Sequence, residues 1–270
     1  MFRFYNFLDN KKKGVKLMSE KLHIVVFGAH PGDAEITAGG TIAKYVRAGH
    51  KVTLVHLTAG ERGHPKMSPQ EYKKQRQEES SKAARVLGAD FMILQHEDGT
   101  LSVDEEIKNE LASLIRELKP DIVITHWKGS DHRDHSSSYD NVRDAVFYAA
   151  SPLMKSSLSP HTVKAVYATE NYEDKTGYTP DAYIDISESF QRKFDAVKQH
   201  AVFREDLYGT HFIEYYASLA RVRGLEAGFG YADNYVLYIR RRGIPLCAPC
   251  ITSTVYKDRH IGLSYSIISN

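Results

Sequence analysis

The chain has 270 residues, of which 42% are hydrophobic and 26% are charged, and its formal net charge is only +2. This composition excludes an intrinsically disordered protein, which would combine low hydrophobicity with a high net charge. No run of about 18 apolar residues is present, so the sequence predicts no membrane-spanning helix. Two cysteines, Cys247 and Cys250, cannot build a disulfide framework. We expect a soluble, cytoplasmic protein.

The positive charge is concentrated at the start of the chain. Residues 1–17 carry five basic side chains against Asp9, a net +4, so residues 18–270 sum to −2. A basic folded face would suggest a nucleic-acid partner, but this excess lies on a short terminal stretch, and we expect no nucleic-acid binding. We interpret residues 1–21 as a flexible extension, with Met18 as an alternative start. An ordered N-terminal arm is the alternative.

Strand-like and helix-like segments alternate through the first half of the chain. Short apolar runs, each followed by a longer amphipathic segment, indicate buried strands joined by crossover helices. The predicted strands are 23–29, 51–58, 90–94 and 121–125, and the predicted helices are 34–49, 69–88, 104–118 and 136–150. The fold class expected is α/β, a three-layer Rossmann-like fold with a mostly parallel sheet. Ligands of such sheets bind beyond the carboxyl ends of the strands.

The second half is less regular. It predicts strands at 164–169, 182–186 and 235–240 and helices at 187–202 and about 211–227. No linker separates the halves, so we assign residues 22–242 to one α/β domain. Residues 243–270 mix Pro, Cys, Thr and Ser without a period and stay an unassigned tail.

Two turns at predicted strand ends carry metal-ligand side chains. His30-Pro31-Gly32-Asp33 follows the first strand, and a turn ending in His132-Arg133-Asp134-His135 follows the fourth. A catalytic zinc site uses three protein ligands and leaves one position open. His30 and Asp33, with His135 or His132, would supply such a set. The alternatives are that Asp33 only caps the following helix and that the second turn is a solvated charged loop.

The residues around these turns resemble the LmbE/PIG-L family of zinc-dependent N-deacetylases. The first turn resembles the family's A-H-P-D-D-x-E motif, residues 58–63 its T-x-G-E-x-G segment, and residues 132–135 its H-P-D-H motif. Weaker echoes lie in Lys193–His200, which resembles K-x-D-A-x-x-x-H, and at 231–235, which resembles Y-A-E-x-F. The resemblance covers roughly residues 22–235.

The resemblance implies a Rossmann-like fold, hydrolysis of an N-acyl group and specific roles for site residues. It makes His30, Asp33 and His135 the metal ligands. His132 would stabilise or protonate the tetrahedral intermediate, and Asp134 would orient it. Arg62 lies in the segment that contacts substrate; the alternative is a surface arginine paired with Glu61.

Gly32 departs from the family pattern, in which the first aspartate of H-P-D-D is the general base. Such a base typically contributes about 10²- to 10⁴-fold. Three interpretations follow: another group takes over, the protein binds zinc without efficient turnover, or Gly32 enlarges the pocket and another proton path is used. The candidates for another base are Asp131, Asp134, His132 and Glu35, with Asp134 and His132 favoured.

The function predicted is a zinc-dependent hydrolase that removes an N-acyl group, acetyl first of all, from an amino-sugar or glycoconjugate. Another divalent metal is an alternative to Zn²⁺. The rival is a zinc- and ligand-binding protein of the same fold with little or no catalysis, because Gly32 replaces the base. The family's trimers and hexamers suggest a homo-oligomer.

Overall fold

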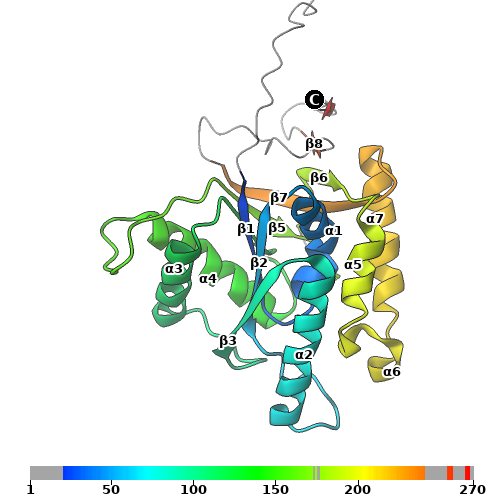
Figure 1. Ribbon diagram of the computed structural model, residues 1–270, viewed down its shortest axis with the longest axis horizontal. Coiled ribbons are helices and arrows are strands. Elements are labelled where there is room, and N and C mark those ends of the chain that lie inside the picture. Colours follow the sequence, from blue (N-terminus) through cyan, green and yellow to red (C-terminus); the bar gives the residue numbers. More distant parts are fainter. Residues whose placement is uncertain (1–20, 173, 175–176, 241–253, 258–264, 268–270) are drawn as a thin grey trace, which may run out of the picture.

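A computed structural model describes residues 21–172, 174, 177–240, 254–257 and 265–267 (Figure 1). The strands of these residues form a single sheet in the order β3-β2-β1-β4-β5-β7-β6-β8-β9. The strands are β1 His23–Gly28, β2 Lys51–Thr58, β3 Asp90–His96, β4 Ile122–His126, β5 Ala165–Thr169, β6 Ala182–Asp185, β7 Ala232–Arg240, β8 Thr254–Lys257 and β9 Tyr265–Ile267.

The first five strands of the sheet are all parallel. β1 lies between β2 and β4, with Val26 level with Leu54 on one side and Ile124 on the other. β5 continues the parallel arrangement beside β4, and β7 joins it antiparallel. The mostly parallel sheet predicted from the apolar runs is therefore confirmed.

Helices cover both faces of this sheet, which gives three layers (Figure 1). α3 and α4 lie together on one face, while α1, α2, α5 and α7 lie on the other. A separate apolar core fills each interface, one under α1 and α2 and the other under α3 and α4. The helices are α1 Asp33–Arg47, α2 Pro69–Leu87, α3 Glu105–Leu118, α4 Arg133–Ala150, α5 Phe190–Val197, α6 Glu205–Tyr208 and α7 Phe212–Ala227, with a short 3₁₀ helix at Ala201–Phe203.

Local sequence signals set several helix ends. The Ser68 hydroxyl accepts a hydrogen bond from the Glu71 N–H, and the Glu71 carboxylate accepts one from the Ser68 N–H, so the two form a capping box at the start of α2. Asp104 accepts the Ile107 N–H at the start of α3. Because these partners are close in sequence, the ends of both helices were predicted to within one residue.

Several segments differ from the sequence prediction. β7 begins at Ala232 and not at residue 235, β3 continues to His96, and α6 was not predicted. α4 begins at Arg133 and not near residue 136, so Asp134 and His135 lie in its first turn. The helix predicted at 187–202 is shorter: α5 ends at Val197 and the 3₁₀ turn follows. Within the tail at 243–270, β8 pairs with β6 and β9 pairs with β8, which extends the sheet. Cys247 and Cys250 lie outside the described residues.

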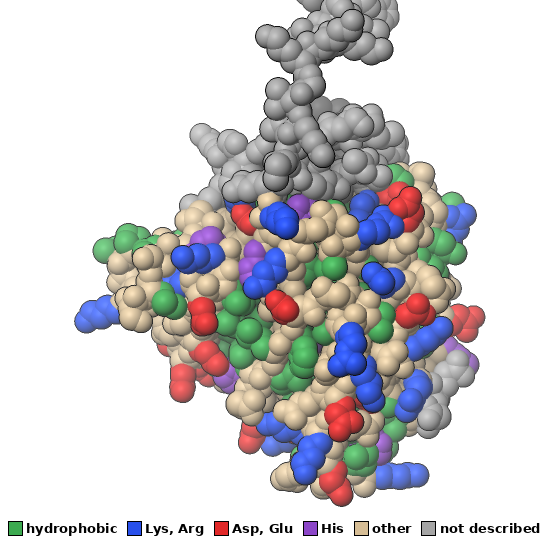
Figure 2. Space-filling view, in the orientation of Figure 1, with side chains coloured by type: hydrophobic (Ala, Val, Ile, Leu, Met, Phe, Trp, Pro, Cys, Tyr) green, Lys and Arg blue, Asp and Glu red, His purple; other side chains and the backbone are tan. Residues whose placement is uncertain are grey.

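The surface charge and the helices of the described part bear on the expectations drawn from composition. Acidic and basic side chains are interspersed over the face seen in Figure 2, with apolar side chains between them. Among the described residues, no helix combines the length and the apolar character needed to cross a membrane.

Candidate metal centre

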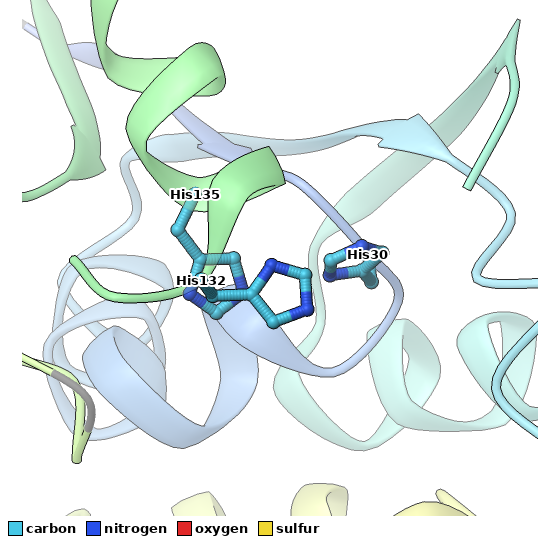
Figure 3. Close-up of side chains that lie close together, drawn as sticks. All are labelled: His30, His132 and His135. Carbon is cyan, nitrogen blue, oxygen red and sulfur yellow. The ribbon is translucent and has the colours of Figure 1, made fainter. Parts of the chain in front are cut away.

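The two ligand-bearing turns meet at one edge of the sheet. β1 and β4 are neighbouring parallel strands, so the turn after β1 and the start of α4 after β4 lie side by side. His30 and Asp33 come from the first turn, and His132 and His135 come from the N-terminal end of α4. Figure 3 shows the rings of His30, His132 and His135 gathered between these two segments.

The Asp33 carboxylate lies at metal-site spacing from two histidines. Oδ2 of Asp33 lies 3.3 Å from Nδ1 of His30 and 3.4 Å from Nε2 of His135. Ligands bound at 2.0–2.1 Å around a tetrahedral ion are about 3.3 Å apart. Asp33 thus connects His30 and His135, the other two ligands that the family resemblance implies. Among the described residues, the groups whose ligand atoms all lie within 4.8 Å of one another are His30/His132/His135, Asp33/His126/His135 and His30/Asp98/Asp134.

The electrostatics of His135 and Asp33 suit metal binding. Burial, followed by repulsion from His126, lowers the pKa of His135 to about 3, so its imidazole is neutral. Burial raises the pKa of Asp33, but His135 and His30 outweigh it and hold that pKa well below its usual value. A neutral imidazole and an ionised carboxylate are the forms that bind metals.

The far side of His30 faces two carboxylates. Nε2 of His30 lies 3.3 Å from Oδ2 of Asp134 and 3.1 Å from Oδ1 of Asp98. Burial lowers the pKa of His30, but Asp33, Asp134 and Asp98 together raise it well above its ordinary value. Carboxylates that accept the second N–H of a metal-binding histidine fix its orientation and strengthen it as a ligand.

Asp134 is held in place by the loop after β3. Its carboxylate accepts hydrogen bonds from the backbone N–H groups of Gly99, at 2.6 Å, and Leu101, at 3.2 Å. The family resemblance implies that this carboxylate orients His132, whereas in the structure it contacts His30. Asp98, from the same loop, was not identified from the sequence, although it follows a predicted strand end.

His132 stands beside the ligands without being tied to a carboxylate. Its Nδ1 accepts the backbone N–H of Asp134 at 3.3 Å, which caps α4. The ring stacks on His135 with centroids 4.3 Å apart and meets His30 edge-on at 5.0 Å. Burial and the proximity of His30 lower the pKa of His132. It is therefore a neutral imidazole that carries its proton on Nε2.

His126, at the end of β4, is a further histidine that the sequence analysis missed. Its Nε2 lies 3.2 Å from Oδ2 of Asp33, and its ring stacks on His135 at 4.0 Å. The same Nε2 accepts the backbone N–H of Ala29 at 3.0 Å. That hydrogen bond occupies the lone pair of Nε2, so His126 is a poorer candidate ligand than His30. Its ring packs against His135 and contacts Asp33.

Asn171 connects His135 to helix α7. Its side-chain amide lies 3.0 Å from Nδ1 of His135, and its oxygen accepts the hydroxyl hydrogen of Tyr216. All three side chains are buried. No sequence signal identifies Asn171, since its role depends on the packing of the segment after β5 against α7.

The turn that holds His30 and Asp33 is braced by buried polar groups. Glu35 accepts the Gly32 N–H at 3.1 Å through Oε2 and lies 3.0 Å from Nε2 of His200 through Oε1. Arg76 donates to the carbonyl of Pro31. Glu35 is fully buried with both oxygens engaged, so this candidate for a replacement base is committed to the turn.

Gly32 adopts φ +99°, a left-handed conformation that favours glycine. A Cβ atom at this position would lie 2.6 Å from Cε2 of Phe203. The phenyl ring of Phe203 fills the adjacent space, so the interpretation in which Gly32 enlarges the pocket is wrong.

Arg62 lies near the site but faces outward. Its guanidinium donates to the Glu97 carboxylate at 2.9 Å, and its backbone N–H donates to Oδ2 of Asp98, also at 2.9 Å. Its side chain is 46% exposed and is not among the cavity-lining residues. The partner is Glu97, where the sequence alternative had Glu61.

A cavity of about 510 Å³ opens onto the metal cluster. Its lining contains the candidate ligands, His132 and Asp98, and also the polar or partly polar side chains of Tyr72, Arg76, Asn171, Tyr208 and Thr210. Beside these residues the cavity is lined by Ile36, Tyr172, Val202, Phe203, Phe212 and Tyr216.

Known proteins share both this sequence pattern and this fold. The family model "PIG-L: GlcNAc-PI de-N-acetylase" matches residues 25–146. The diacetylchitobiose deacetylase of Thermococcus kodakarensis is 30% identical over 219 residues, which cover 76% of this chain and 79% of that protein. The chain belongs to the PIG-L family.

Other proteins similar to this PIG-L chain include hydratases. The 4-oxalmesaconate hydratase of Pseudomonas putida is 28% identical over 212 residues, covering 75% of this chain and 80% of that protein. The crystal structure of the 4-carboxy-2-hydroxymuconate hydratase from Pseudomonas putida matches with a TM-score of 0.75 and 25% identity, over 84% of this chain and all of that one. The PIG-L relatives are thus enzymes of more than one reaction type.

Proposed function

We propose that this PIG-L chain is a metal-dependent N-deacylase that removes an acetyl or similar acyl group from an amino-sugar or glycoconjugate. The observation that carries the proposal is the cluster of histidines and carboxylates in which Asp33 Oδ2 lies 3.3 Å from Nδ1 of His30 and 3.4 Å from Nε2 of His135. It stands in a chain whose family model is that of a de-N-acetylase.

His30, Asp33 and His135 would hold the metal, which we take to be Zn²⁺. A bound zinc ion polarises an amide carbonyl and lowers the pKa of the water bound to it to about 7. Asp134 and Asp98 would keep the His30 ring in place through its Nε2–H, and the Asn171 amide contacts Nδ1 of His135. These contacts fix the ligands before the ion binds.

His132 is the side chain that would stabilise the oxyanion in this proposal. Of the four groups considered as substitutes for the missing base, it alone lines the cavity. Asp134 and Glu35 have their oxygens engaged by backbone N–H groups and histidines, and Asp131 is exposed. With Nδ1 occupied, His132 presents its Nε2–H, which can donate a hydrogen bond to the developing oxyanion, while the proton released by the attacking water would pass to the leaving nitrogen.

Metal content and acetate release test the proposal together. Purified protein is assayed for Zn²⁺ and for release of acetate from N-acetylglucosamine and N,N′-diacetylchitobiose. We expect His30→Ala and His135→Ala to lose the metal and the activity, while His161→Ala, whose ring binds the Pro120 carbonyl, retains both. Metal loading that survives both ligand substitutions would contradict the assigned site.

Hydration of an unsaturated carboxylic acid is the second candidate function. Two observations favour it: a hydratase relative spans 75% of the chain, and Gly32 provides no general base for deacylation. The product tells the reactions apart, because hydration of 4-carboxy-2-hydroxymuconate removes its conjugated absorbance and releases no acetate. Absorbance loss abolished by His135→Ala, without acetate release from any sugar, would replace the first proposal with the second.

A further inference from the structure

The cavity beside the metal cluster has one wall made almost wholly of hydrocarbon. Phe203 and Phe212 meet edge to face with centroids 6.0 Å apart, and Tyr172 packs on Phe212 at 5.3 Å. Ile36 and Val202 continue this surface. We call these five residues the aromatic wall.

The tyrosine hydroxyl next to this wall does not make it polar. Tyr216 adjoins Tyr172, with ring centroids 6.5 Å apart, and donates its hydroxyl hydrogen to Asn171. That bond is directed toward the ligand His135 and away from the phenyl rings. A sugar hydroxyl placed against Phe203 or Phe212 would lose its hydrogen bonds to water without replacement, which is unfavourable.

The aromatic wall begins at the reaction centre itself. The Phe203 ring packs directly over Gly32, which lies in sequence between the candidate ligands His30 and Asp33. Ile36 follows Asp33 by one turn of α1 and is 2% exposed. A group on this wall is therefore close to the bond that the metal cluster would act on, and it is not at the distant mouth of the cavity.

From this arrangement we propose that the chain acts on a substrate whose amide lies next to an aromatic or extended hydrocarbon group, which binds on the aromatic wall. This inference rests on the proposed deacylase function and specifies its substrate class. The apolar group has two chemical sources, the N-acyl substituent or the aglycone of the sugar. Both would gain from leaving water for the surface formed by Phe203 and Phe212.

The aromatic wall also explains why glycine, and not the family's aspartate, occupies position 32. A carboxylate at residue 32 would place a charge against Phe203, where it could not be solvated. Glycine leaves an uncharged backbone beneath the ring. Glycine at position 32 thus lets the Phe203 ring pack beside the candidate ligands.

Four matched compounds test the substrate class on the metal-loaded protein: N-acetylglucosamine, its phenyl β-glycoside, N-hexanoylglucosamine and N-benzoylglucosamine. We measure kcat/KM for compounds that are hydrolysed and a calorimetric Kd for those that are not. Burial of a phenyl or hexanoyl group is expected to favour at least one apolar compound over N-acetylglucosamine by on the order of 10- to 100-fold. The glycoside identifies the aglycone as the source, and the other two identify the acyl group.

Phe203→Ala and Phe212→Ala should each reduce that preference about 10-fold. Phe147→Ala, a 70% exposed ring on α4, is the matched control and should leave it unchanged. Equal values for all four compounds, or a preference that survives both substitutions, overturns the inference. Absence of hydrolysis together with preferential binding of an apolar compound overturns the deacylase function and retains the wall.

Discussion

The ammonium of Lys193 lies 2.5 Å from Oδ1 of Asp233, and both side chains are almost completely buried. The other oxygen of Asp233 accepts the backbone N–H and the hydroxyl of Thr41 in α1, at 2.8 and 3.0 Å. These contacts join α5 and β7 to α1, the helix that begins at the candidate ligand Asp33. The two weak sequence motifs at 193–200 and 231–235 are therefore connected in space.

Replacement of Lys193 by methionine tests this connection. The substitution leaves the Asp233 carboxylate buried with no cation, so we expect a loss of about 3–5 kcal/mol in the free energy of unfolding. Lys198→Met, an exposed lysine at the end of the same helix, should change it by less than about 0.5 kcal/mol. Urea denaturation of both variants measures the difference, and equal stabilities would show that the pair contributes nothing.

Arg116 makes a second stability prediction, on the opposite face of the sheet. Its guanidinium donates to five backbone carbonyls near the end of α4, those of Tyr148, Ala149, Ser151, Met154 and Leu158. Arg116→Met leaves several of these acceptors unpaired, so we expect a loss of about 3 kcal/mol. Arg192→Met, an exposed arginine on α5, is the control. Thermal and urea unfolding should separate the two, and matching curves would contradict the prediction.

Asp134→Asn tests the support of His30. The amide removes the negative charge beside Nε2 of His30, 3.3 Å away, and we expect a 10- to 100-fold loss of zinc affinity. Asp140→Asn, a partly exposed residue on the same helix that pairs with Arg143, should not change the affinity. Chelator competition gives the affinity, and circular dichroism verifies the fold of each variant. An unchanged zinc affinity would show that Asp134 holds the loop at Gly99 in place but does not support His30 as a ligand.

Asp174 gives the fold a pH dependence. Burial raises its pKa to about 6, although hydrogen bonds from the Asn171 N–H, 2.9 Å from Oδ2, and from the Ser130 side chain oppose that shift; among the described residues, Oδ1 has no donor. Because the folded pKa exceeds the unfolded value of about 3.9, the folded state binds the proton more tightly. The wild type should therefore lose stability as pH rises from about 4 to 6, by about 1–3 kcal/mol.

Asp174→Asn removes that titration. The variant should be more stable than the wild type at pH 7 by about the same 1–3 kcal/mol, with the advantage vanishing near pH 4. Asp195→Asn, exposed on α5, serves as the control. Urea unfolding at pH 4 and pH 7 gives the comparison. A variant less stable than the wild type at pH 7 would mean that the Asp174 carboxylate is favourably paired.

The sequence predicted the fold well where the determinants are local. The strand at 51–58 matches β2 at both ends, because its apolar run is bounded by Gly49 and a loop. The start of α4 was placed three residues too late, because the ring of His132 caps the helix where Ser, Thr, Asp or Asn is the usual N-cap residue. A histidine cap has no comparable sequence signal.

The candidate site likewise contains residues that the sequence identified and residues that depend on tertiary packing. The sequence predicted that the turns after the first and fourth strands meet, because parallel strands bring their carboxyl ends to one edge, and the family resemblance then implied His30, Asp33 and His135 as ligands. Asp98 and Asn171 reach the site from loops after β3 and β5, whose course depends on packing. The contact between Gly32 and Phe203 joins residues far apart in the chain, and no periodicity or spacing encodes it.

Gly32→Asp restores the family's residue and yet should not restore its chemistry. The new Cβ would lie 2.6 Å from Phe203, and φ of +99° is unfavourable for aspartate. We expect a stability loss of about 1–3 kcal/mol and no gain in acetate release. The double variant Gly32→Asp/Phe203→Ala removes the steric conflict and keeps the backbone strain, so any activity gained through the new carboxylate should appear only in the double variant. Initial rates of the two variants, of Phe203→Ala and of the wild type complete the cycle. Higher activity in Gly32→Asp alone would show that Phe203 moves aside and that the aromatic wall does not constrain residue 32.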